Sequence, residues 1–169
     1  MLLLKAVATA AFAVSISVPA LLMAAPTTQA AAPTVFFVQT ADKALLTSNQ
    51  LILTSPNNRT TWFADAPSNA TGLMPTNHYY NLLWGKPSSH FNLNNPNASL
   101  VGEVINPQTH QFKTVSIVVN LDRATLDNHQ IIYHIHALPK QDTLLDLQKP
   151  VVLLHPTLFI DRYICPTCD

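Results

Sequence analysis

The sequence predicts an all-β fold, an antiparallel β-sandwich of about seven or eight strands, immunoglobulin-like or similar, with one short helix. Three observations lead to this prediction. After residue 33, apolar side chains mostly recur at every second position. Short polar stretches rich in Asn and Pro separate these segments, and a single stretch has helical spacing.

The clearest strand is KTVSIVVNL, in which Val115, Ile117, Val119 and Leu121 share one face. This alternation predicts that one face of the strand is buried. HQIIYHIHAL repeats the pattern after an expected connection at residues 120–128. The other expected strands are residues 34–40, 51–55, 60–66, 97–105 and 151–160, with a further short strand within 41–50.

Pro156 cannot donate a backbone hydrogen bond, so residues 151–160 are expected at a sheet edge or broken at this proline. The expected helix is PTNHYYNLLWG, residues 75–85. Thr76 suits its N-cap, Trp84 lies on its apolar stripe, and Gly85 suits a left-handed C-terminal position. We expect this helix to close one end of the sandwich, followed by a polar surface segment at 86–100.

The chain begins with the features of a secretory signal peptide, because Lys5 precedes an apolar run that ends in small residues. Cleavage is expected after Ala30, with Ala24 as the alternative site and an uncleaved anchor as the alternative fate. Residues 1–30 are then the signal peptide, residues 31–160 one β-sandwich domain and residues 161–169 a C-terminal tail. We therefore expect a periplasmic or extracellular protein without a membrane span after cleavage.

The tail contains the two cysteines of the chain, Cys165 and Cys168, in a C-x-x-C motif. An oxidising compartment favours a disulfide between them. A zinc site would need two further ligands, and a thioredoxin-like motif would stand at a helix start after a strand. We predict the disulfide.

The composition argues against several classes of function. Lys and Arg together number 9, as do Asp and Glu, so no basic field exists for nucleic acid. The chain has 3 glycines, no G-x-S-x-G motif and a single glutamate, Glu103. Phosphate-binding loops, nucleophile elbows and paired glutamates are therefore missing from the sequence, and an enzyme is not the favoured interpretation.

Several motifs between Trp62 and Leu100 form a recognisable series: FADAP, then Gly72, then a short helix ending in Trp84, then PNA. This series resembles a family of small exported all-β prokaryotic proteins of uncharacterised function. The positions that carry the resemblance are Phe63, Asp65, Pro67, Gly72, Trp84, Pro96, Asn97 and Ala98. The resemblance implies export and a β fold. Ala66 departs from the arginine usual after the aspartate, so Asp65 is expected to bond amides of its own turn.

His134 and His136 share one face of a strand, at about 7 Å along the backbone. Their motif, YHIHAL, also looks like the copper-binding strand of copper/zinc superoxide dismutases, although the rest of that family's pattern is missing. His155 would be a third ligand if its strand lay nearby, and imidazoles suit copper or zinc. The alternative is that both histidines face solvent on the wet side of the sheet.

The sequence therefore favours an exported, non-enzymatic protein with a structural or interaction role. Its partner would be another envelope or surface protein, or a second copy of the chain. The signs expected of such a protein are an exposed apolar patch or an unpaired edge strand, for instance residues 151–160. The alternative function is a periplasmic copper- or zinc-binding protein that uses His134, His136 and His155.

Overall fold

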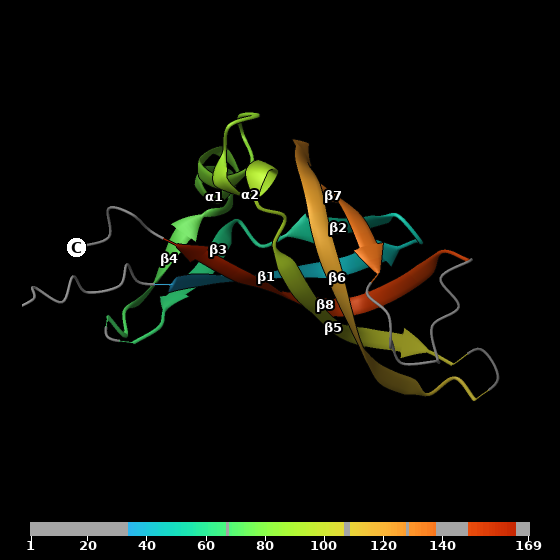
Figure 1. The fold of residues 1–169 in the computed structure, drawn as a ribbon. Coiled ribbons are helices and arrows are strands. Elements are labelled where there is room, and N and C mark those ends of the chain that lie inside the picture. Colours follow the sequence, from blue (N-terminus) through green and yellow to red (C-terminus); the bar gives the residue numbers. More distant parts are fainter. Residues whose placement is uncertain (1–33, 67, 107–108, 128, 138–148, 165–169) are drawn as a thin grey trace, which may run out of the picture. The chain divides into compact units, whose positions relative to one another are not determined.

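Eight antiparallel strands and two short helices make up the described part of the chain (Figure 1). The computed structural model describes residues 34–66, 68–106, 109–127, 129–137 and 149–164, all within the compact unit Ala31–Asp169. The predicted all-β antiparallel fold is confirmed. The predicted signal peptide and the cysteine pair lie outside the described residues.

The strands are β1 (Thr34–Leu46), β2 (Gln50–Pro56), β3 (Arg59–Ala64), β4 (Thr71–Pro75), β5 (Asn97–Ile105), β6 (Phe112–Asp127), β7 (Gln130–Ala137) and β8 (Val151–Ile164), and the helices are α1 (Thr76–Leu83) and α2 (His90–Leu93).

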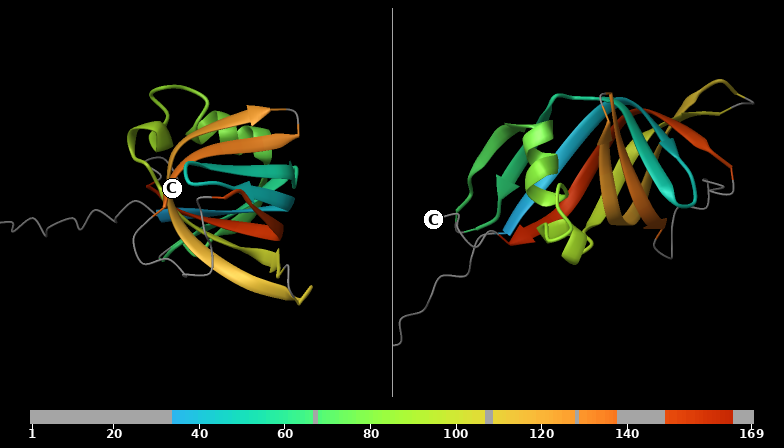
Figure 2. Two further views of the ribbon diagram at one scale, coloured as in Figure 1. Left: turned by 90° about the vertical axis from the view of Figure 1, so that its right-hand side faces the viewer. Right: turned by 90° about the horizontal axis from the view of Figure 1, so that it is seen from above.

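Six of the strands pair in a closed ring, in the order β1, β2, β7, β6, β5, β8 and back to β1. The long strand β6 arches from the β5 side of the ring to the β7 side (Figure 2). The predicted division into two separate sheets is not confirmed, because these pairings join the described strands into one sheet. Both arrangements bury one face of every strand, so the alternation of apolar residues is the same in each.

Closure depends on β1, which changes partner along its length. Its first half pairs with β3, from Val35 to Val38, and its second half pairs with β2, from Ala41 to Leu46. β8 lies along the other side of β1 over both halves. Residues 57–58 join β2 to β3, so the chain turns there, and β3 leaves the ring with β4 as a separate hairpin.

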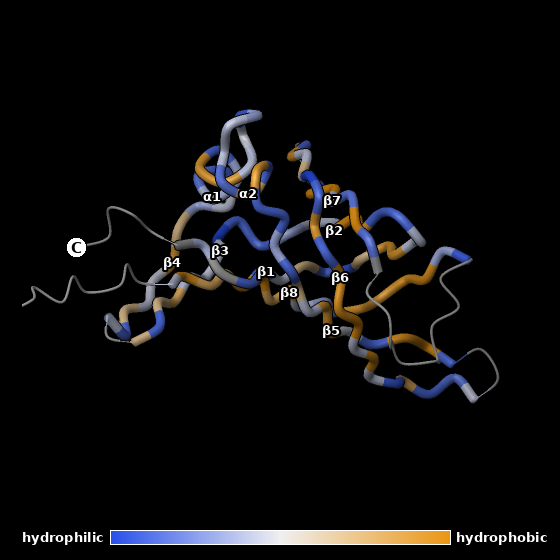
Figure 3. Tube along the Cα trace, in the orientation of Figure 1, coloured by the Kyte–Doolittle hydropathy of each residue, from blue (hydrophilic) through white to orange (hydrophobic). Residues whose placement is uncertain are grey.

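Apolar side chains fill the interior of the ring. The predicted inward face of β6, Val115 to Leu121 at every second residue, is buried as expected. Strand β7 contributes Ile131, Tyr133 and Ile135 in the same way, and the start of β8 is strongly hydrophobic (Figure 3). Alternation therefore identified the inward residues of both strands correctly.

The boundaries of several elements differ from the prediction. Residues 120–127 continue β6, because they pair with β7 as far as Asp127 opposite Gln130. Strand β8 runs to Ile164, into the predicted tail, and it pairs with both β1 and β5, so the expectation of an edge strand is wrong. Pro156 instead lies where the register between β8 and β5 shifts. Strand β4 and helix α2 were not predicted.

Helix α1 lies within the predicted range, and Trp84 is buried as expected. The N-cap position is Pro75, and the Thr76 hydroxyl makes no capping bond. Gly85 is not left-handed, so that prediction is wrong. A Cβ at Gly85 would lie 2.9 Å from backbone atoms of Asn81, and this close approach requires glycine.

The helices close one end of the ring with aromatic side chains. Tyr79 of α1 packs edge-on against Phe37 of β1, with ring centroids 5.1 Å apart. Trp84 contacts Phe91 of α2 at 5.2 Å and Tyr133 of β7 at 5.8 Å. Such tilted and edge-on contacts stabilise aromatic clusters beyond the area they bury.

Polar groups cross this apolar interior in one continuous series, which we call the buried polar chain. Trp84 Nε1 donates to the Tyr79 hydroxyl at 3.1 Å. The Tyr79 hydroxyl also forms a hydrogen bond with the Tyr133 hydroxyl. Tyr133 donates to Gln39 Oε1 at 2.6 Å, and Gln39 Nε2 donates to Thr60 Oγ1 at 3.2 Å. The series then runs from Thr60 to Thr76, 3.1 Å apart, and ends at the Asn57 carbonyl, 2.8 Å from Thr76 Oγ1.

The two ends of the buried polar chain fix the direction of every bond. The Asn57 carbonyl only accepts, so Thr76 donates to it and accepts from Thr60. Thr60 in turn accepts from Gln39, which places the NH₂ end of that amide toward Thr60. At the other end Trp84 only donates. Burial raises the pKa of both Tyr79 and Tyr133, which keeps them neutral donors.

We expect Thr60→Val to lower the free energy of unfolding by about 1–3 kcal/mol, because it leaves the buried Gln39 amide and Thr76 hydroxyl each short of a partner. Thr61→Val, on the opposite face of β3, is the control and should change it by about 0.5 kcal/mol or less. Urea denaturation measures both variants. Equal stability of the two would contradict the role given to the buried polar chain.

Candidate functional site

The predicted histidine pair lies on the outer face of β7. His136 Nε2 lies 2.6 Å from Asp122 Oδ2, and Asp122 Oδ1 accepts a hydrogen bond from Asn95 at 2.8 Å. His134 Nε2 lies 3.3 Å from a guanidinium nitrogen of Arg123. The two rings therefore engage different partners on β6, where the register shifts between Leu121 and Arg123.

The third predicted ligand, His155, is not brought to this pair. It lies on β8, which β5 and β6 separate from β7 in the ring, and it is exposed with a left-handed φ of 47°. No three His, Cys, Asp or Glu side chains gather in a way that could hold a metal ion, within the ranges that the structure describes. Cys165 and Cys168 lie outside those ranges. The remaining histidines are spread over α1 (His78), α2 (His90), the β5–β6 turn (His110) and the β6–β7 turn (His129).

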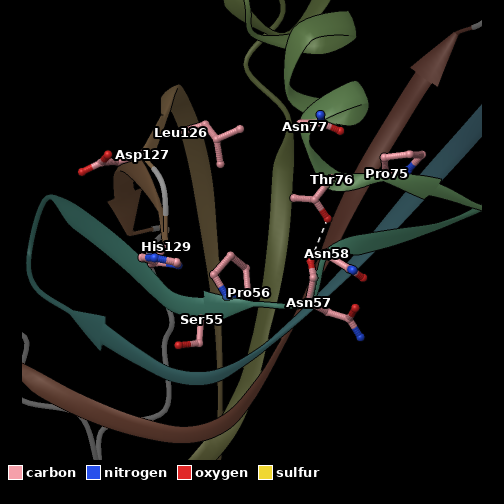
Figure 4. A pocket seen from close by; sticks show the side chains of 10 residues that line it. All are labelled: Ser55, Pro56, Asn57, Asn58, Pro75, Thr76, Asn77, Leu126, Asp127 and His129. Carbon is pink, nitrogen blue, oxygen red and sulfur yellow. Dashed lines mark hydrogen bonds between the residues drawn. The ribbon is translucent and has the colours of Figure 1, made fainter.

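A cleft of about 770 Å³ opens where three distant segments meet, and we call it the polar cleft (Figure 4). Its lining comes from the end of β2 and the turn to β3, from the start of α1, and from the β6–β7 end. The lining residues are Ser55, Pro56, Asn57, Asn58, Pro75, Thr76, Asn77, Leu126, Asp127 and His129.

Backbone hydrogen bonds tie the walls of the polar cleft together. The Ser55 N–H donates to the His129 carbonyl at 2.9 Å, which joins β2 to the β6–β7 turn. The Thr76 N–H donates to the Asn58 carbonyl at 2.9 Å, which joins α1 to the β2–β3 turn. Thr76 is also the last hydroxyl of the buried polar chain. The cleft is therefore built on backbone that the core holds in place.

A second surface feature lies on the outside of the sheet. Four large apolar side chains are exposed there: Phe63 by 39%, Leu73 by 59%, Val118 by 40% and Phe159 by 46%. Phe36 stacks on Phe63 with centroids 5.1 Å apart and planes 15° from parallel. Together with Val38 these residues form the apolar outer face, which contains a shallow hollow of about 270 Å³.

The registers align the residues of the apolar outer face in one row, with the small polar residues Thr61 and Ser99 between apolar ones. Leu73, Thr61, Val38, Phe159, Ser99 and Val118 occupy directly paired positions across β4, β3, β1, β8, β5 and β6. Strand β4 ends the strand order and pairs only with β3 among the described strands, so it is the edge strand in place of β8.

The sequence led us to expect an exposed apolar patch, with residues 151–160 as the example, and Phe159 of that segment does lie in the apolar outer face. The other residues of this face and the polar cleft were not predicted, although a signal for the apolar outer face exists. Strands of period two place adjacent residues on opposite faces, so an apolar pair such as Phe36–Phe37, Trp62–Phe63 or Leu158–Phe159 must expose one member. The polar cleft has no comparable signal, because its walls come from segments that only the closed ring brings together.

Neither described helix has the length or the apolar composition needed to cross a bilayer. Comparison with protein-family models, with curated proteins and with solved structures found no match to this chain.

We expect replacement of His134 and His136 by alanine to leave the copper and zinc content of the purified protein unchanged. The Arg123 guanidinium beside His134 repels a divalent cation, and His136 already bonds Asp122. Elemental analysis after incubation with each metal gives the result. Stoichiometric copper or zinc that disappears in the double variant would contradict this expectation.

Proposed function

We propose that the protein is an exported, non-enzymatic structural protein that associates with a second copy of itself through the apolar outer face. The leader-like sequence of residues 1–30 supports export to the periplasm or the cell exterior. The closed, well-packed ring supports a role as a rigid frame that presents surfaces.

The apolar outer face is the observation that carries this proposal. Soluble monomers rarely expose contiguous apolar surface of this kind without a partner. The paired row crosses six strands, which spans about 24 Å at the usual strand spacing. A stable interface buries about 800 Å² on each partner, which corresponds to a square of about 28 Å. The row therefore covers most of that width.

The charge of the face favours a second copy as the partner. In a two-fold symmetric dimer each face meets itself, so a face rich in one sign of charge would repel its copy. Among the described residues that line the hollow, Asp161 is the one charged side chain. The rings of Phe36, Phe63 and Phe159 would instead meet apolar atoms. The face is thus complementary to itself.

Sedimentation velocity over a range of concentrations tests the proposal. The wild-type protein is expected to form a dimer, and Phe63→Ser with Phe159→Ser to shift it to monomer, because the double variant removes the two most exposed rings of the face. Phe112→Ser is the matched control, since Phe112 is 61% exposed at the far end of β6.

Two results would overturn the proposal: a wild-type protein that stays monomeric at every concentration, or a dimer that persists in the double variant. Co-sedimentation of a monomeric wild type with phosphatidylcholine vesicles would assign the face to lipid and would also overturn it.

A further inference from the structure

Three polar side chains that line the polar cleft make no hydrogen bond with the described residues, whereas backbone groups of its walls are hydrogen-bonded. The side chains of Asn58, Asn77 and His129 make no hydrogen bond or ion pair with another residue in the described part of the chain. The nearby backbone groups are bonded to one another across the walls. Ligand sites place a small number of such polar groups around a concave volume, among apolar atoms.

Charge excludes several ligand classes. The described residues that line the cleft include no Lys or Arg, so a phosphate or carboxylate would find no guanidinium or ammonium group among them and would face Asp127. A dication would find a single carboxylate, fewer than calcium or magnesium sites use. A neutral ligand is therefore favoured.

The remaining groups suit a saccharide better than a peptide. Asn58 and Asn77 each present a donor and an acceptor, as vicinal hydroxyls require. Pro56 and Leu126 offer apolar surface for the C–H face of a sugar ring. A peptide that adds as a strand would need free backbone groups, but β2 pairs on both sides beside the cleft, and Pro75 of the edge strand β4 has no N–H to donate.

We propose that the polar cleft is a binding site for a neutral saccharide of two or three sugar units. Asn58 at the β2–β3 turn and Asn77 at the start of α1 hold its hydroxyls from one wall, and His129 from the other. The volume of about 770 Å³ accommodates a ligand of this size. The site shares no residue with the apolar outer face, so it stands independently of the proposed self-association.

Isothermal titration calorimetry with maltotriose, cellotriose and chitotriose tests the site on the purified wild-type protein. At least one of these neutral trisaccharides should bind with a dissociation constant of about 1 mM or tighter. Asn58→Ala with Asn77→Ala should weaken that binding at least about tenfold. Asn81→Ala is the matched control, because Asn81 is exposed on the same helix outside the cleft, and it should bind as the wild type does.

Circular dichroism confirms that each variant is folded. If the double variant does not fold, Asn77→Ala alone serves, since Asn77 is exposed on the surface of α1. Absence of binding by all three trisaccharides at about 10 mM would overturn the proposal. Trisaccharide binding of unchanged affinity in the variant without the Asn58 and Asn77 amides would overturn it as well. So would binding of glucose 6-phosphate or of a tetra-alanine peptide that is tighter than binding of the trisaccharides.

Discussion

The change of partner along β1 is the constraint on which the rest of the structure depends. Gln39 lies at the change, between the residues that pair with β3 and those that pair with β2. Its side chain is buried, and it bonds Tyr133 of β7 on one side and Thr60 of β3 on the other. A buried amide costs stability unless its donor and acceptor are both satisfied, so this arrangement fixes how three strands meet.

The other hydrogen bonds of the buried polar chain connect Gln39 to the β2–β3 turn and to α1. Thr60 bonds Thr76, and Thr76 holds the β2–β3 turn to the first residue of α1. The polar cleft lies beside this junction, so its walls depend on the same bonds that order the core. On the outside of the sheet, the pairing of β1 with β3 and β8 aligns Phe36, Phe63 and Phe159 into one surface. One feature of the backbone thus positions both candidate surfaces.

The sequence predicted the elements better than their arrangement. Period-two alternation located Val115 to Leu121 and Ile131 to Ile135 on inward faces, and helical spacing located α1. The closed ring was not predictable from the sequence. Apolar and polar residues alternate along β1 in the same way whether a single strand pairs along its side or, as here, β3 and then β2. Residues 120–127 look polar enough for a loop, yet pairing with β7 makes them strand. The cleft required knowledge of three-dimensional contacts among residues 55–58, 75–77 and 126–129, which are separate segments of the chain.

Amide hydrogen exchange in β2, followed by nuclear magnetic resonance, tests the closed ring most directly. Successive N–H groups of a strand point to opposite neighbours. β2 lies between β1 and β7, so the amides of Leu51, Ile52, Leu53 and Thr54 should all exchange slowly. If β2 instead ended a sheet that pairs only with β1, every second amide of this run would exchange fast, and the closed ring would be contradicted.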